Sequence, residues 1–266
     1  MDTYPFALVL AVATAFVTVF LGFLPAKNIR SGFFAREAFK VAAAWVVIVA
    51  ISPLSVMHYP FILAVFSLIA WWNLQRDATF TGKIWLNLAS GLGISIGVLV
   101  ILAVTPGSLP TKPFGPIDAP GSLSTQGWDW SQALCLASLY LGGAIIGLAY
   151  VSYVLCREAF TCPGIGGFIQ KGTGLLFNLT LVRVVVLLIE IVTVPDAPGD
   201  IRGEDVRHFD FLFLPVGACV FLILPTLAYL SRRATRFSSR LQPTRLLVAI
   251  MLVDFVTEIL ARIELL

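Results

Sequence analysis

The last apolar stretch of the chain, residues 246–266, is interrupted by charged residues, and three of them are of types that suit proton exchange. Asp254, Glu258 and Arg262 recur every fourth residue, so they stack on one face if the stretch is helical. A charge at membrane depth costs about 3 kcal/mol or more unless it faces protein, water or a partner. We therefore expect this face to point into the protein, where a carboxylate in an apolar slot can hold or release a proton.

A second apolar run carries Arg183 and Glu190, seven residues apart and so roughly on one helix face. Counted from the start of each run, Arg183 matches Asp254 in depth and Glu190 matches Arg262 within one residue, if the helices run the same way. The sequence predicts the cross-helix pairs Arg183–Asp254 and Glu190–Arg262, which leaves Glu258 without an obvious cation. The alternative is an intrahelical Glu258–Arg262 pair near the bilayer edge, with Arg262 snorkelling outward.

The composition places these charges in a membrane protein. Of 266 residues, 58% are hydrophobic and only 12% are charged, about half the charge of a soluble domain, and the mean hydropathy is +0.92. The net charge of +3 is small and gives no reason to expect a nucleic-acid partner. We predict a polytopic, all-α protein embedded in membrane lipid.

Apolar runs of about the length that a spanning helix needs predict eight transmembrane helices in one domain covering residues 1–266. The first 24 residues lack a basic n-region and a small-residue cleavage site, so we expect a retained first span rather than a signal peptide. The expected spans are residues 5–24, 38–57, 59–74, 84–104, 131–155, 174–194, 211–230 and 246–264.

The basic residues predict the orientation. Thirteen of the 18 Lys and Arg residues fall in, or within three residues of, alternate connections, between the first and second, third and fourth, fifth and sixth, and seventh and eighth spans. By the positive-inside rule these connections are cytoplasmic, and the N-terminus and C-terminus are both external. We expect a multi-pass protein of an inner (plasma) membrane of the prokaryotic type.

Two external connections are candidate docking surfaces for extrinsic protein subunits. Residues 105–130 hold five prolines among Gly and Ser and end in Trp128-Asp129-Trp130, so they form no regular helix. Ordered loops of this length in compact proteins tend to be functional. The acidic stretch 194–210 is the second candidate, and a solvated face is its simpler interpretation.

A short element recurs at the cytoplasmic ends of the spans. Arg36-Glu37-Ala38-Phe39 and Arg157-Glu158-Ala159-Phe160 share one pattern, and Arg76-Asp77-Ala78 is a shorter copy. An Arg at the membrane boundary beside a helix-starting acid explains the pattern. A duplicated hairpin is the alternative.

Histidine and cysteine usage argues against several cofactors. The four Cys residues form no CxxC pair, so we expect no metal site. Only His58 and His208 are present, both in predicted external loops, which excludes a two-haem relay inside the bundle. A single haem held at the outer surface by these two histidines is an alternative. No nucleophile elbow, P-loop or HExxH motif appears, so we assign no catalytic residue.

The span layout and three sequence patches resemble the membrane-anchor subunit of dimethyl sulfoxide reductase and related molybdenum enzymes. The patches are Trp128-Asp129-Trp130-Ser131, Gly142-Gly143-Ala144-Ile145-Ile146-Gly147, and Glu258-Ile259-Leu260-Ala261-Arg262. The family ends its last helix in a similar Glu-aliphatic-aliphatic-Gly-Arg pattern, and here Ala261 replaces the Gly. The resemblance implies a haem-free, eight-span subunit.

The resemblance also implies a function. It predicts docking of iron–sulfur and molybdopterin subunits on the external face, exchange of electrons and protons with quinone or quinol, and no covalently bound cofactor. His58 occupies a place comparable to an important histidine of the family, although only His58-Tyr59-Pro60 remains of its motif. Our quinone-site candidates are Glu258 and Glu190 as proton acceptors, with Arg262 and His58 as neighbours.

Two other function classes fit the same residues. Inward charges and Gly-interrupted spans are also typical of secondary transporters for small solutes. A structural subunit of a membrane complex is the third class, in which the charges only specify how helices pair.

Overall fold

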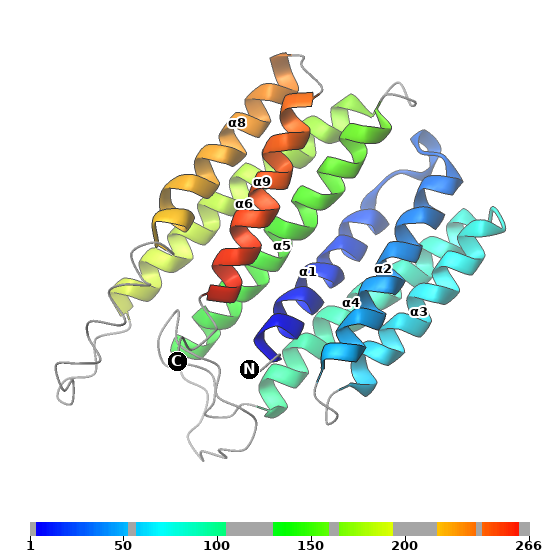
Figure 1. The fold of residues 1–266 in the computed structure, drawn as a ribbon, viewed down its shortest axis with the longest axis horizontal. Coiled ribbons are helices and arrows are strands. Elements are labelled where there is room, and N and C mark those ends of the chain that lie inside the picture. Colours follow the sequence, from blue (N-terminus) through cyan, green and yellow to red (C-terminus); the bar gives the residue numbers. More distant parts are fainter. Residues whose placement is uncertain are drawn as a thin grey trace.

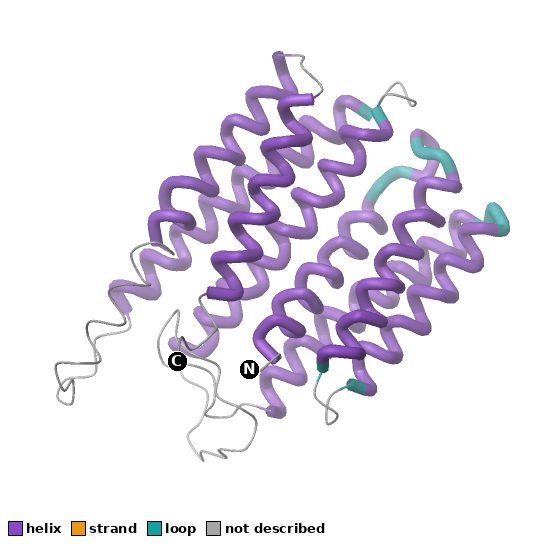
Figure 2. The backbone as a smooth tube through the Cα atoms, in the orientation of Figure 1, coloured by secondary structure: helices purple, strands orange, loops and turns teal. Residues whose placement is uncertain are grey.

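The protein is built from long helices that run roughly alongside one another (Figure 1). The computed structural model describes residues 4–52, 57–104, 130–159, 165–193, 217–237 and 241–260. No strand occurs in these residues, which confirms the all-α prediction for this part of the chain. Figure 2 shows that the described connections are short and that nearly all of the described backbone is helical.

The long helices of the described residues each overlap one of the predicted spans. They are α1 (Tyr4–Phe23), α2 (Ser31–Ile51), α3 (His58–Gln75), α4 (Thr79–Val104), α5 (Trp130–Glu158), α6 (Gly166–Thr193), α8 (Leu224–Phe237) and α9 (Leu241–Leu260). Two short segments complete the described helical structure, the 3-10 helix η1 (Ala26–Asn28) and the π-helical segment η2 (Cys219–Ile223), which leads directly into α8.

Several helices start earlier than the hydropathy predicts. α2 begins at Ser31 rather than near residue 38, and α6 begins at Gly166 rather than near residue 174. Hydropathy marks only the apolar part of a helix, whereas the helix continues through polar first turns. For α2 this matters, because the extra turns carry Glu37 into the packed interior.

Local chemistry sets two of the boundaries. α2 ends where the Ser52 backbone N–H donates to the carbonyl of Ile48 at 2.9 Å and its hydroxyl donates to the same carbonyl at 2.6 Å. Pro53 follows in the sequence, and the residue before proline is disfavoured in a helix. α3 and α4 are joined by a tight turn in which Asp77 has a φ of 59°, a left-handed conformation that Asp tolerates.

The helices form two groups of four. In the first group α1 packs against α2 and α4, and α3 packs against both α2 and α4. In the second group α5 and α8 each pack against both α6 and α9. The groups meet mainly where α1 lies against α5. In Figure 1, α1 begins and α9 ends at the same end of the protein.

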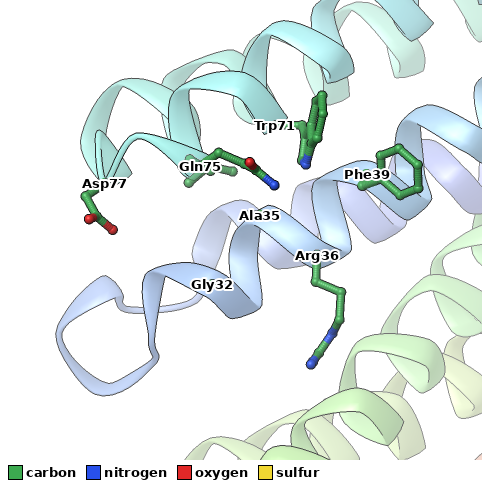
Figure 3. A pocket seen from close by; sticks show the side chains of 8 residues that line it. Gly32, Ala35, Arg36, Phe39, Trp71, Gln75 and Asp77 are labelled. Atoms are coloured by element: carbon green, nitrogen blue, oxygen red, sulfur yellow. The ribbon is translucent and has the colours of Figure 1, made fainter.

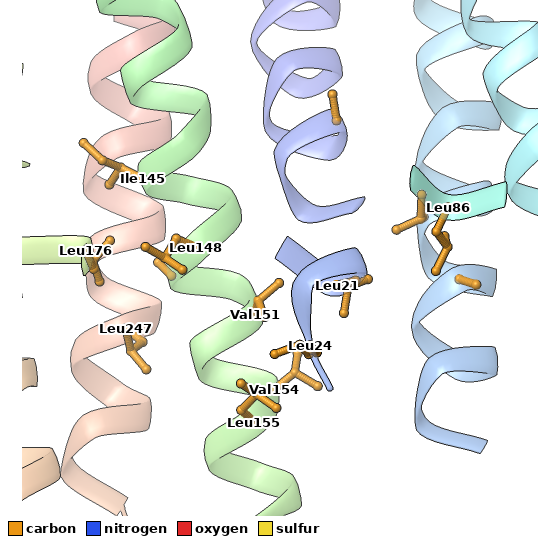
Figure 4. Close-up of a cluster of buried hydrophobic side chains, with 14 of the residues drawn as sticks. Leu21, Leu24, Leu86, Ile145, Leu148, Val151, Val154, Leu155, Leu176 and Leu247 are labelled. Carbon is orange, nitrogen blue, oxygen red and sulfur yellow. The ribbon is translucent and has the colours of Figure 1, made fainter. Parts of the chain in front are cut away.

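α5 is the central helix of the fold. Of its most apolar stretch, Leu136–Glu158, 72% is buried, compared with 28% for the corresponding stretch of α6. Figure 4 shows side chains of Ile145 and Leu148 on the side of α5 that faces Leu176 and Leu247, while Val151 and Val154 lie toward α1. One helix therefore supplies core residues to both groups.

Small residues allow the two groups to approach closely. A Cβ added at Gly147 would lie 2.9 Å from the backbone N of Val17, and one added at Gly143 would lie 2.4 Å from Cγ1 of Val12. Both glycines belong to the sequence patch 142–147, and a face of small residues lets two helices approach closely.

Among the residues that the structure describes, three helices are long and apolar enough to cross a membrane by length and composition: Phe6–Phe23, Leu136–Glu158 and Gly166–Ile189. Helices outside this set also expose large apolar side chains. Phe61 of α3 is 58% exposed and Leu252 of α9 is 60% exposed. These observations support a membrane protein with transmembrane helices.

We predict that Gly147→Ala destabilises the protein by about 1–3 kcal/mol, because the new methyl group meets backbone atoms of α1 that cannot rotate away. The control is Gly174→Ala inside α6, where an added Cβ meets nothing within 4 Å. This control should stabilise the helix by up to about 1 kcal/mol. Thermal unfolding in detergent measures both. Equal midpoints for the two variants would contradict the close approach of α1 and α5.

Candidate functional site

Arg183 of α6 is the centre of a buried ionic cluster. Its side chain is only 2% exposed, and its guanidinium forms salt bridges to Asp254 and Glu258 of α9, both fully buried. Nη1 donates to Oδ1 of Asp254, and Nη2 donates to Oε1 of Glu258. All three charged groups are therefore shielded from the surroundings of the protein.

The geometry of two helices explains this cluster. Asp254 and Glu258 lie four residues apart, so both point from one face of α9. In Figure 1, α6 and α9 run in the same direction, at opposite corners of their group with α5 and α8 between them. The long Arg183 side chain crosses the middle of the group, where its planar fork reaches two carboxylates.

The structure confirms one predicted pair and corrects one expectation. The contact between Arg183 and Asp254 is present, as the depth match predicted. The expectation that Glu258 lacks a cation is wrong, because Arg183 binds it too. The Cα positions of Asp254 and Glu258 are about 6 Å apart along the helix axis, and the two terminal nitrogens of one guanidinium reach both carboxylates.

Gly142 of α5 makes room for this cluster. A Cβ at this position would lie 2.3 Å from Oε1 of Glu258 and 2.7 Å from its carboxyl carbon. α5 therefore presents bare backbone to the Glu258 carboxylate, and any other residue would displace that side chain. The glycines of the patch 142–147 thus serve the ionic cluster as well as the contact with α1.

Among the other predicted site residues, the structure describes the side chain of His58, which does not lie at this cluster. His58 is exposed at the start of α3, where its ring lies 3.9 Å from the Tyr59 ring, centroid to centroid. α3 belongs to the first helix group and Glu258 to the second, so His58 as a neighbour of Glu258 is not supported. The Glu190 side chain, Arg262 and His208 lie outside the described residues, so the Glu190–Arg262 pair stays a prediction.

A second buried carboxylate, Glu37 of α2, was not singled out from the sequence. It is fully buried, and Nζ of Lys40 lies 2.9 Å and 3.1 Å from its two oxygens. The Tyr150 hydroxyl of α5 donates to Oε2 at 2.8 Å, and Nε of Arg36 donates to Oε1 at 3.1 Å. Glu37 thus joins the two helix groups rather than simply starting a helix.

The recurring Arg-acid element contained the signal that could have found this site. Arg36 of one copy bonds to Glu158 of another copy, across the boundary between α2 and α5. The hydrogen bond with Glu158, and then the one with Glu37, raises the pKa of Arg36 above its ordinary value. The bond joins two copies of the element, and the residue spacing inside one copy gives no information about contacts with another copy.

A pocket lies where the two helix groups meet. It has a volume of about 260 Å³ and is almost entirely apolar, with walls from α1, α2, α5 and α9. The lining includes Thr14, Lys40, Ala44, Ile146, Tyr150 and Met251. Ile146 lies four residues from Gly142, and Met251 lies three residues from Asp254, so the pocket ends about one helical turn from the ionic cluster.

A larger pocket of about 490 Å³ lies between α2 and α3 (Figure 3). Phe39 and Trp71 form an aromatic pair on its wall, with ring centroids 5.5 Å apart. Arg36 borders this pocket, but its side chain points away from Trp71, in keeping with its bond to Glu158. The residues that line this pocket include no buried charged side chain, so it is a weaker candidate for a functional site.

Within the described part of the chain, no group of three or more His, Cys, Asp or Glu side chains is placed to hold a metal ion. Cys156 is a buried free thiol, and Cys219 is a half-buried one. Comparison of the chain with models of protein families, with curated proteins and with solved structures gives no match. The resemblance to anchor subunits therefore rests on the predicted span layout and the three sequence patches.

We predict that Arg183→Met destabilises the protein by about 3–5 kcal/mol, because it leaves two buried carboxylates without their guanidinium. The triple variant Arg183→Met, Asp254→Asn, Glu258→Gln removes every charge of the cluster and should recover most of that loss. Thermal or denaturant unfolding in detergent measures both.

The matched control is Arg157→Met, which removes an exposed guanidinium that touches Tyr153 of its own helix. It should change the stability by less than about 0.5 kcal/mol. If Arg183→Met were as stable as this control, the three charges would not depend on one another.

Proposed function

We propose that this chain is an eight-span subunit of a plasma (inner) membrane complex, with both termini external, that exchanges protons and electrons with quinone. In this proposal it anchors extrinsic subunits carrying iron–sulfur and molybdopterin groups. The sequence resemblance supports the class of complex, and the site geometry supports the chemistry.

The observation that carries the proposal is the fully buried Arg183–Asp254–Glu258 cluster inside an apolar helix group. Oxidation of a quinol releases two protons, which need an acceptor beside an apolar slot. Ionisable groups within membrane helices are costly and mark proton or substrate paths by default. Glu258 suits this role because its carboxylate lies against the bare backbone of Gly142.

The arrangement of the helices supports eight spans. Exposed apolar side chains occur on α2, α3, α4, α6, α8 and α9, as expected where lipid surrounds a bundle. We define the basic end of the protein by Lys27, Arg76, Arg157 and Arg233. In Figure 1 the ends of the helices that carry them lie together at one end of the protein. The positive-inside rule makes this end cytoplasmic.

We predict that a phosphatase fused to the C-terminus of the full chain is active, because that terminus is external in the proposed orientation. A fusion that truncates the chain after Arg236, at the basic end, should be inactive as a phosphatase and fluorescent as a green fluorescent protein fusion. The opposite result at either position would reverse the orientation.

A secondary transporter is the second candidate, and the division into two four-helix groups favours it. Two groups that meet mainly at one helix pair could rock against each other around a shared pocket, as carriers do. A carrier works alone in a vesicle, whereas an anchor copurifies with extrinsic subunits and holds quinone. Purification from the native membrane in mild detergent, followed by quinone extraction, separates these two candidates.

We predict that Glu258→Gln lowers quinol-linked turnover of the purified complex by about a hundredfold or more, because the amide cannot take up a proton. Subunit composition should be unchanged, since Gln has the same shape. The control is Glu158→Gln, which alters a partly exposed carboxylate at the basic end. Turnover that is equal in Glu258→Gln and wild type would refute the role of Glu258.

A further inference from the structure

The pocket between the two helix groups has polar chemistry at one end only. Lys40 and Tyr150 line it, and both contact the buried Glu37 carboxylate that lies behind them. The remaining wall is aliphatic, apart from Thr14, whose hydroxyl already donates to the carbonyl of Leu10 at 2.7 Å. The ligand that fits is an apolar molecule with a hydrogen-bonding group at one end.

Lys40 and Tyr150 both bond to Glu37, and these bonds determine which of their donors and acceptors remain for a ligand. The ammonium of Lys40 has three donors and contacts a single carboxylate, so it keeps a donor for a carbonyl oxygen. The Tyr150 hydroxyl uses its proton on Glu37, so its oxygen is left as an acceptor. One end of the pocket thus offers both a donor and an acceptor.

We propose that this pocket binds the ring of a quinone or quinol, with Lys40 and Tyr150 contacting a ring oxygen. This inference rests on the proposed function and names its binding site. Lys40 donates to the carbonyl of the oxidised ring, and the oxygen of Tyr150 accepts from the hydroxyl of the reduced ring. Glu37 is a positioning residue, because it holds both side chains and does not line the pocket itself.

The volume is consistent with one ring. Pockets for drug-sized ligands measure about 300–1,000 Å³, and this pocket, at about 260 Å³, lies just below that range. It suits a single substituted ring whose apolar tail lies outside. This pocket is not the quinone site that the sequence predicted. It lies closer to the basic end of the protein than Glu258 does, and none of the predicted quinone-site residues lines it.

The test uses a photoreactive azido-quinone with a short tail on the full chain, purified in mild detergent with any subunits that accompany it. We expect labelled peptides from α1, α2 and α5 around the pocket, and competition by an unlabelled short-chain quinone. Ala44→Phe places a ring inside the pocket and should reduce labelling by at least about tenfold. Ala43→Phe adds the same ring at the exposed neighbouring position and should leave labelling unchanged.

A second pair of variants tests the polar end without adding bulk. Tyr150→Phe removes only the hydroxyl and should weaken quinone binding about fivefold, the value of one net hydrogen bond. Tyr153→Phe removes a hydroxyl one turn away, outside the pocket lining, and should have no effect. Retention of the unfolding midpoint in each variant shows that a loss of labelling is not a loss of fold.

The outcomes separate this inference from the proposed function. If the wild-type chain takes up no label and copurifies with no quinone, both fail. If it is labelled, but Ala44→Phe is labelled as strongly as Ala43→Phe, quinone binds elsewhere and only the pocket assignment fails. Labelling that falls in Ala44→Phe and Tyr150→Phe but not in their controls supports the site.

Discussion

The packing of the second helix group depends on the burial of one guanidinium between two carboxylates. Arg183 crosses the middle of the group that α5, α6, α8 and α9 form, and it meets Asp254 and Glu258 where neither has exposed surface. A charge in such a place is tolerated only if its partners stay with it. The relative positions of α6 and α9 therefore follow from the reach of a single side chain.

The same constraint appears at the boundary between the two groups. Glu37 is buried at the junction of α2 and α5, with Lys40 and Tyr150 as partners from the two sides. Close contact between α1 and α5 at Gly143 and Gly147 brings the groups near enough for these bonds to form. Apolar packing supplies the proximity, and the buried carboxylate selects one arrangement among those that packing allows.

The sequence predicted the helices and half of the ionic cluster. Hydropathy locates most of the helices, because an apolar run makes up much of their length, and the depth match found Arg183 with Asp254. The depth match missed the bond to Glu258. Matching by depth assigns one partner to each charge, whereas a guanidinium can bind two carboxylates at once. The sequence prediction missed Glu37, because the hydropathy placed the start of α2 after this residue and so treated it as part of a connection.

The stripe formed by Gly142, Ile146 and Tyr150 on α5 has a consequence for how this chain can vary in length. These residues recur every fourth position, and in turn they face the Glu258 carboxylate, the wall of the pocket and the Glu37 carboxylate. Insertion or deletion of one residue between Gly142 and Tyr150 would rotate one end of the stripe by about 100° relative to the other. The eight-residue interval between these two contacts should therefore tolerate substitution of its outward positions but no change in residue number.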